Sequence, residues 1–166
     1  MFSPTYSILI VLATVVVVVL AAIVLVYIAV VVLRRRRQVV ENRRIVRARE
    51  DFRRQRERLE ARFVRLAGAS GMPRGLAWVQ VDFEDAVEFA RDRHSRQLRA
   101  LVAITIRFEA IEGGGMEDVE AVGNLRAATA IFHFDDECWD TLGRAIFNLD
   151  PLGTIRHFDQ EMEVVE

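Results

Sequence analysis

The order of apolar and polar positions divides the chain into four zones, of which the first is the plainest. Residues 8–33 form 26 consecutive positions without a charged side chain, and only Thr14 and Tyr27 carry a polar group there. An apolar run of this length crosses a bilayer as a helix, because about 20 helical residues span the hydrocarbon core. We therefore predict a transmembrane helix at residues 8–33 and a short extracytoplasmic N-terminus at residues 1–7.

A cleaved signal peptide is the competing interpretation of this segment. Residues 1–7 hold no basic side chain, and the apolar run is longer than the usual signal-peptide core of about 7–15 residues. The residues before Arg34 are Val and Leu, which make a poor cleavage site. These features favour a retained anchor.

Residues 34–67 lack Pro and Gly and predict an Arg-rich juxtamembrane helix, a stalk between membrane and domain. Opposite charges recur at helical spacing, as in Glu50 with Arg54 and Arg56 with Glu60. Apolar side chains seven positions apart form one narrow seam, at Ile45, Phe52, Leu59 and Leu66. The seam is half of a coiled-coil heptad. Two interpretations stay open: weak parallel self-association, or a solvated or membrane-lying helix whose seam packs on something else.

The small, turn-prone residues 68–73 predict a hinge, after which residues 74–166 form one domain. Apolar side chains take the even positions from Leu98 to Phe108, the alternation of a half-buried strand. Similar patterns predict further strands at residues 76–83, 87–91, 128–135 and 139–149, with a turn at 92–95 and a hairpin joining the last two.

Asp150 and Pro151 fit the N-cap and first turn of a helix that we expect to reach about Met162. The predicted fold class is therefore α+β, a small antiparallel sheet of about four or five strands with one C-terminal helix across it. A curved sheet that grips a helix, roughly as in cystatin-like or NTF2-like folds, agrees with this order. No motif selects among such folds.

Charge divides the chain at the same boundary as the pattern. The 23 basic residues are all Arg, against 24 acidic residues, for a net charge of −1. Residues 1–67 hold 14 Arg and 5 acids, a balance of +9, whereas residues 68–166 hold 9 Arg and 19 acids, a balance of −10. Basic flanks stay in the cytoplasm. We therefore predict a single-pass protein of the cell membrane, with its N-terminus outside and its acidic C-terminal domain in the cytoplasm.

The basic flank also predicts a surface for anionic lipid head groups, which attract juxtamembrane Arg. Its expected residues are Arg34, Arg35, Arg36, Arg37, Arg43 and Arg44. Nucleic acid is not an expected partner, because no recognised reading module follows the basic helix and the attached domain is acidic.

Residues 112–120 combine three Gly with four carboxylates, which predicts an acidic loop between strands. The candidate partner-contact residues are Glu112, Glu117, Asp118 and Glu120. The loop lacks EF-hand spacing and a phosphate-binding Lys, and the three His share no ligand spacing, so we predict no metal and no cofactor. The single Cys138 excludes an internal disulfide.

The favoured function is non-enzymatic: a membrane-anchored interaction domain that binds a protein partner or its own copies as a scaffold. The alternative is a pocket domain, cystatin-like or NTF2-like, that binds a small ligand or acts as an enzyme. This alternative predicts an apolar cavity reached by Glu109, His133 or Asn148. Filling of that space by aromatic side chains would count against it, namely by Phe132, Phe147 and Phe158. Trp78 and Trp139 are interpreted as core side chains.

Overall fold

The structure is a computed structural model, and it describes residues 4–71, 75–135 and 137–165. Within the first range, the side chains of residues 4–19, 21, 22, 37 and 71 lie outside the description. The chain divides into two compact units, Met1–Val46 and Arg47–Glu166. We call the second the C-terminal unit, and each unit is described by itself.

Helix α1 runs over Pro4–Gly71, a length of 68 residues. In the part of the chain that the structure describes, no helix combines the length and apolar character needed to cross a membrane. The predicted span, residues 8–33, falls largely on positions whose side chains are not described. Its described part is apolar and open: ten large apolar side chains from Leu20 to Leu33 are 40 to 69% exposed.

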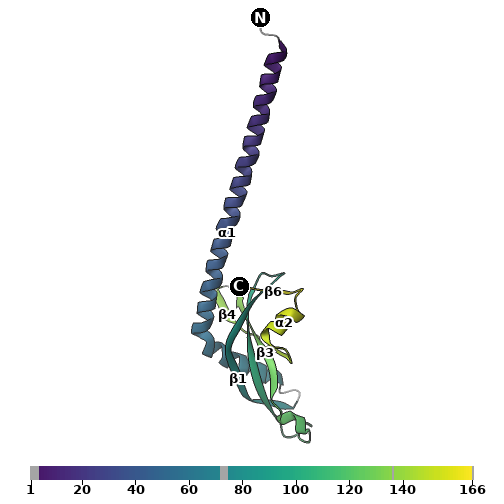
Figure 1. Ribbon diagram of the computed structural model, residues 1–166. Helices are drawn as coiled ribbons and strands as arrows, with labels where there is room; N and C mark the ends of the chain where they lie inside the picture. The colour runs from purple at the N-terminus through teal and green to yellow at the C-terminus, as the bar shows by residue number, and fades with distance from the viewer. Residues whose placement is uncertain (1–3, 72–74, 136, 166) are drawn as a thin grey trace. The chain divides into compact units, whose positions relative to one another are not determined.

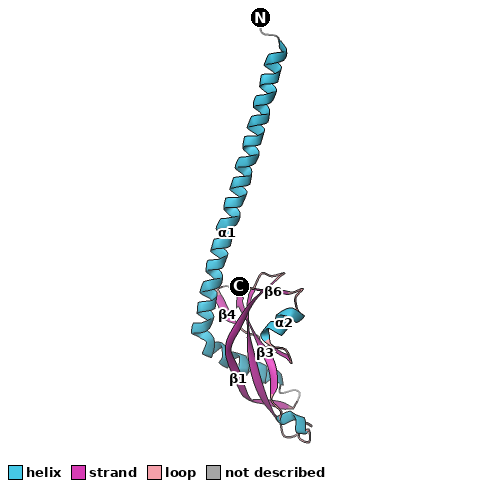
Figure 2. Cartoon of the chain, viewed as in Figure 1, coloured by secondary structure: helices cyan, strands magenta, loops and turns pink. Residues whose placement is uncertain are grey.

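The C-terminal unit contains an antiparallel sheet, drawn in magenta in Figure 2. Its strands run in the order β4-β3-β2-β1-β6, and β5 also pairs with β3. The strand bounds are β1 Leu76–Asp92, β2 Leu98–Ala110, β3 Arg126–Asp135, β4 Cys138–Asp140, β5 Ala145–Phe147 and β6 Met162–Val164. The α+β class, the antiparallel sheet and a C-terminal helix are thus confirmed.

Two strand predictions differ from the structure in how the chain is divided. The segments predicted at residues 76–83 and 87–91 belong to one strand, β1, whose register against β2 shifts between Phe83 and Val87. A β-bulge bends a strand without ending it. The sequence pattern cannot distinguish one bulged strand from two separate strands. The strand predicted at residues 139–149 is instead two short strands, β4 and β5, that pair with different parts of β3.

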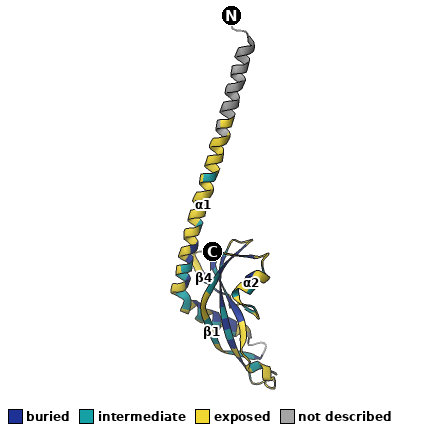
Figure 3. Ribbon diagram, viewed as in Figure 1, coloured by how far each residue is buried: buried dark blue, intermediate teal, exposed yellow. Residues whose placement is uncertain are grey.

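The main core lies between the sheet and residues 48–67 of α1. Five helix side chains are at most 1% exposed and belong to the same buried cluster as the inner face of the sheet, namely Ala48, Phe52, Leu59, Phe63 and Ala67. Figure 3 shows the buried positions of the C-terminal unit on the strands and on this part of α1. The predicted stalk is therefore, over these residues, a structural element of the domain, and the unit begins at Arg47 rather than at residue 74.

Aromatic rings hold the helix to the sheet. Phe52 contacts Phe89, Phe132 and Trp139 with ring centroids 6.0, 5.3 and 4.9 Å apart. The indole Nε1–H of Trp139 donates to the backbone oxygen of Ala48 over 2.7 Å in a buried position. This hydrogen bond satisfies the polar atom of a ring that is only 2% exposed, as burial of an indole requires. Trp139 is a core side chain, as predicted.

Helix α2 covers the opposite face of the sheet over Pro151–His157. Its Asp150 cap is as predicted, since the carboxylate accepts from the backbone N–H of Gly153. The helix ends at His157, earlier than expected, and Met162 begins β6, which pairs with Ala90–Asp92 at one end of β1. Residues 158–161 form a turn instead of continuing the helix, and strand pairing takes Met162. In Figure 1, α2 lies beside the sheet.

Of the predicted hinge, residues 68–71 continue α1, which ends at Gly71. The remaining two positions, residues 72 and 73, lie outside the described residues. Gly75, with φ of +69°, precedes the first residue of β1. The helix therefore extends further than predicted, to Gly71, and β1 begins at Leu76.

Candidate functional site

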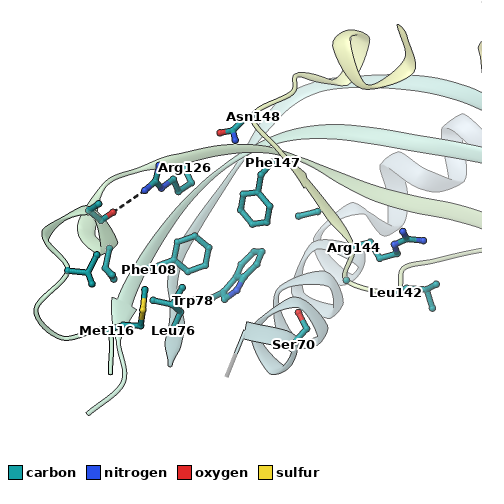
Figure 4. Close-up of a pocket in the computed structure, with 15 residues that line it drawn as sticks. Ser70, Leu76, Trp78, Phe108, Met116, Arg126, Leu142, Arg144, Phe147 and Asn148 are labelled. Carbon is teal, nitrogen blue, oxygen red and sulfur yellow. Dashed lines mark hydrogen bonds between the residues drawn. The ribbon is translucent and has the colours of Figure 1, made fainter. Parts of the chain in front are cut away.

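A pocket of about 590 Å³ opens on the inner face of the sheet, beside the C-terminal end of α1. We call it the aromatic pocket. Figure 4 shows its lining side chains, which come from the last turn of α1, from β1, β2 and β3, from β5 and the residues on either side of it, and from the loop after β2. The apolar part of the lining comprises Leu76, Trp78, Phe108, Met116, Val119, Ala121, Val122, Leu142, Ala145 and Phe147. The remaining lining residues are Ser70, Arg126, Gly143, Arg144 and Asn148.

Strand register brings three rings to one wall of the aromatic pocket. Trp78 is paired with Phe108 between β1 and β2, and Ala128 with Phe147 between β3 and β5. The centroid of Trp78 lies 5.3 Å from that of Phe108 and 6.4 Å from that of Phe147. Phe108 and Phe147 are 6.3 Å apart. The wall is therefore one aromatic surface, and the 40% exposure of Phe147 leaves part of it open.

The aromatic pocket exists because α1 stops before it covers the whole inner face. Phe63 still reaches Trp78, with centroids 6.2 Å apart, but Ser70 is the last helix residue that lines the pocket. Gly143 lets the chain after β4 pass close to the helix. A Cβ on Gly143 would lie 2.6 Å from the backbone nitrogen of Ala67, and φ at this Gly is +68°. A side chain there would push the helix end away from the sheet.

The loop after β2 forms the other side of the aromatic pocket. Its Gly114 lies against Gly75, so close that a Cβ on Gly114 would be 2.7 Å from the Cα of Gly75. The Ile111 N–H also donates to the Gly75 oxygen over 2.8 Å. The loop then turns through a short 3₁₀ helix, η2, over Glu120–Gly123. These contacts hold Met116, Val119 and Val122 in place over the pocket.

Glu117 of the acidic loop has a structural role within the loop. Its carboxylate accepts from the backbone N–H of Gly113. Backbone N–H groups, first its own and then those of Gly113, Gly115 and Met116, hold the pKa of Glu117 below its usual value. Glu112, Asp118 and Glu120 are exposed. Partner contact through these acids stays a prediction.

The charged side chains among the described lining residues are of one sign. Among the described lining residues, Arg126 and Arg144 are the charged ones, and none is Asp, Glu, His or Cys. Nη2 of Arg126 donates to the backbone oxygen of Ala121 over 3.2 Å, which is the dashed line in Figure 4. The guanidinium of Arg144 points away from the three rings in the same view. The lining thus offers apolar contact and positive charge, and it lacks the usual proton-transferring side chains.

Of the three polar groups predicted to reach a cavity, only Asn148 lines the aromatic pocket. Glu109 is exposed, and His133 lines a separate hollow of about 290 Å³ that it shares with Arg99 and Asp135. The three Phe whose filling of the cavity would count against a pocket domain lie in separate places. Phe132 is buried beneath α1, Phe147 lines the pocket, and Phe158 packs with the cluster around α2.

The remaining predicted residues lie in different places. Phe52 and Leu59 of the predicted seam are buried in the core of their own unit, which removes them from any seam between copies, whereas Leu66 is half-buried and Ile45 is 8% exposed. The predicted lipid-contacting residues Arg34, Arg35, Arg36, Arg43 and Arg44 have exposed side chains, and the side chain of Arg37 lies outside the described residues.

Most residues that line the aromatic pocket were not among the predicted site residues. Trp78 was interpreted as a core side chain, but it is half-buried and lines the pocket. The sequence did contain one indication, at Arg126. This residue has the same parity as Ala128 and Ala130, which are buried on the inner face of the sheet, and it is paired with Ile106. An Arg in inward register at the start of a strand marks a place where the core ends.

Asp92 organises the turn between β1 and β2, as the sequence predicted for residues 92–95. One carboxylate oxygen accepts from the N–H groups of His94 and Ser95 over 3.0 and 2.9 Å, and the other from Arg99. The hydrogen bond from the Ser95 backbone is the main cause that lowers the pKa of Asp92, and those from the Ser95 side chain and His94, with the charge of Arg99, lower it further.

No protein-family model, curated protein or solved structure matches the chain. The site is therefore interpreted from its own geometry.

Proposed function

We propose that the chain is a single-span membrane protein whose C-terminal unit binds a small apolar ligand on the cytoplasmic side. The main support for a binding role is the aromatic pocket. Its volume of about 590 Å³ lies within the roughly 300–1,000 Å³ of small-molecule sites, and apolar side chains line most of it. Binding rather than catalysis is proposed because the lining supplies contact surface without an acid–base pair.

The open aromatic wall supports a ligand of apolar character. Trp78, Phe108 and Phe147 turn their rings toward a common space in Figure 4, and solvent reaches that space. Burial of apolar area releases about 25 cal/mol per Å², so a ligand that covers these rings gains affinity from them. The same rings stack against each other and hold the wall in shape without a ligand.

The membrane anchor is supported by sequence and by exposure. Residues 8–33 carry no charge, and the described apolar side chains from Leu20 to Leu33 are largely exposed. A contiguous exposed apolar surface is unfavourable in water, and the hydrocarbon core of a bilayer would bury it. Arg34, Arg35 and Arg36 follow it directly and are exposed, as expected for residues that meet lipid head groups and stay in the cytoplasm.

Ligand binding can be tested with 2-naphthylmethanol, an uncharged aromatic probe. The full chain is labelled with 5-fluorotryptophan and placed in nanodiscs of zwitterionic lipid, so that its two Trp give two fluorine signals. The Trp139→Phe variant assigns them. We expect a saturable shift of the Trp78 signal and none of the Trp139 signal, because Trp139 is buried under α1.

A pair of matched variants localises the binding. Phe147→Ala removes part of the wall and is expected to weaken probe binding by about 1 kcal/mol, roughly fivefold. Leu152→Ala, at a side chain with nearly the same exposure on α2, is expected to leave it unchanged. An unshifted Trp78 signal, or an equal effect of both variants, would contradict the proposed pocket.

Membrane orientation can be tested with the single Cys138, which is exposed. A membrane-impermeant maleimide is expected to label it only after the cells are permeabilised. The double variant Ser3→Cys, Cys138→Ser moves the thiol to the other side of the predicted span and should be labelled in intact cells. Labelling of Cys138 in intact cells would overturn the cytoplasmic placement.

A further inference from the structure

We infer that the ligand of the aromatic pocket is an organic anion, a carboxylate with an aromatic or branched apolar body, and that Arg126 binds its acid group. This inference rests on the proposed function and names the substrate class of the same site. In this arrangement the apolar body lies against Trp78 and Phe147, and the carboxylate lies at the end of the pocket next to η2.

The charge of the described lining is the reverse of the charge of the surrounding domain. Residues 68–166 hold 19 acidic side chains and 9 Arg. The described lining of the aromatic pocket contains two of those Arg and none of the acids. Because the guanidinium of Arg144 points away from the rings, the positive charge at the site is that of Arg126, which attracts an anion and repels a cation.

The position of Arg126 suits an acid group of the ligand. The pairing of Arg126 with Ile106 places both on the inner face of the sheet, the face on which Phe108 and Phe147 lie. One of its N–H groups is fixed by the Ala121 oxygen. No other acceptor among the described residues bonds to this guanidinium, which has five N–H donors in all. A carboxylate matches the free edge of such a planar fork.

Asn148 supplies a second polar group at the same edge. Its backbone N–H donates to the oxygen of Ala127 over 3.0 Å, which holds residue 148 beside the strand position of Arg126. The backbone of Asn148 has φ of +61°, a left-handed conformation that Asn tolerates better than most residues. Figure 4 shows its amide at the rim of the pocket, on the side of Arg126.

The inference is tested with three probes that share one ring system: 2-naphthoate, 2-naphthylmethanol and 2-naphthylmethylammonium. Isothermal titration calorimetry of the full chain in zwitterionic nanodiscs measures each affinity, with empty nanodiscs as the blank. We expect 2-naphthoate to bind at least about tenfold more tightly than the alcohol, since a hydrogen bond to a charged group contributes about 1.5 kcal/mol or more. The ammonium is expected to bind most weakly.

Two Arg variants identify the residue. Arg126→Gln is expected to reduce the preference for 2-naphthoate over the alcohol to less than about twofold. Arg107→Gln is the matched control: Arg107 is exposed and lies one position beyond Ile106 on β2, so strand alternation turns it to the outer face. This control is expected to keep the full preference.

The outcomes separate the inference from the proposed function. Equal binding of 2-naphthoate and 2-naphthylmethanol would overturn the anion inference and leave the pocket proposal standing. Absence of binding by all three probes would overturn both. A tenfold preference that survives in Arg126→Gln would overturn the assignment of the carboxylate to Arg126.

Discussion

The packing of α1 against the sheet predicts a large effect of Phe52→Ala on the C-terminal unit. Phe52 is 0% exposed and makes three aromatic contacts, with Phe89, Phe132 and Trp139. Removal of a buried Phe side chain costs about 3–5 kcal/mol, which includes the cavity that it leaves. Domains of this size are stable by about 5–15 kcal/mol, so the loss is about a fifth of the total or more. The midpoint temperature should fall by roughly 12–20 °C.

The assay is urea unfolding of the full chain in nanodiscs, followed by Trp fluorescence, because Trp139 lies 4.9 Å from the ring of Phe52 and reports its surroundings directly. Val46→Ala on the same helix is the control, since Val46 is 53% exposed and its loss should change stability by less than about 0.5 kcal/mol. If Phe52→Ala also cost less than about 1 kcal/mol, the helix would be a solvated stalk and the described core would be refuted.

Two further predictions concern the chain near the aromatic pocket and the β1–β2 turn. Gly143→Ala should destabilise the unit by about 2 kcal/mol or more in urea unfolding, because its φ is +68° and the new Cβ meets the Ala67 backbone. Gly123→Ala, with nothing within 4 Å, should be nearly neutral. Asp92→Asn should lower stability by about 1–2 kcal/mol at pH 7. Because the folded pKa of Asp92 is lowered, its contribution is present above about pH 4 and is lost as the pH falls through the folded pKa. The stabilities of the original chain and of Asp92→Asn in urea unfolding should therefore converge in acid. A difference in stability that stays constant between pH 7 and pH 2 would contradict this role of Asp92.

Local patterns in the sequence predicted the strands well, because each follows from residues close together in the chain. The alternation from Leu98 to Phe108 gave the correct inner face of β2, on which Ala100, Val102 and Ile104 are buried. Asp150 correctly marked the start of α2. A buried face and a capping oxygen are properties of single elements, so they can be read without the rest of the fold.

The place of α1 could not be predicted in the same way. The seven-residue spacing of Phe52 and Leu59 shows that the helix has an apolar face, but it does not say whether a second copy, a bilayer or a sheet covers that face. Arginines at its border added to the difficulty. Arg49 stacks over Phe89 at 5.0 Å and donates to the Val165 oxygen, and Arg56 bonds to Glu60 and to the backbone near Asp85. The apolar stem of a long cationic side chain can pack along the border of a buried interface. The charge of the same side chain, in the sequence alone, indicates a solvent-exposed face.

The aromatic pocket was hidden for a related reason. Its rings occupy inward positions of ordinary strands, and such positions are normally filled core. The pocket arises because α1 ends at Gly71, before it covers Phe108 and Phe147, and because the loop after β2 closes the other side. Where a helix ends relative to a sheet depends on tertiary packing, which no local pattern records.

Hydrogen exchange tests most directly the central claim that residues 48–67 of α1 and the sheet form one folded unit with a pocket at the helix end. The amide groups of residues 50–67 and those at the centre of β2 and β3 are compared by mass spectrometry on the full chain in nanodiscs. We predict the same high protection in both, because residues that share a core open together in global unfolding. Exchange of the helix amides several hundredfold faster than that of the strands would contradict the account.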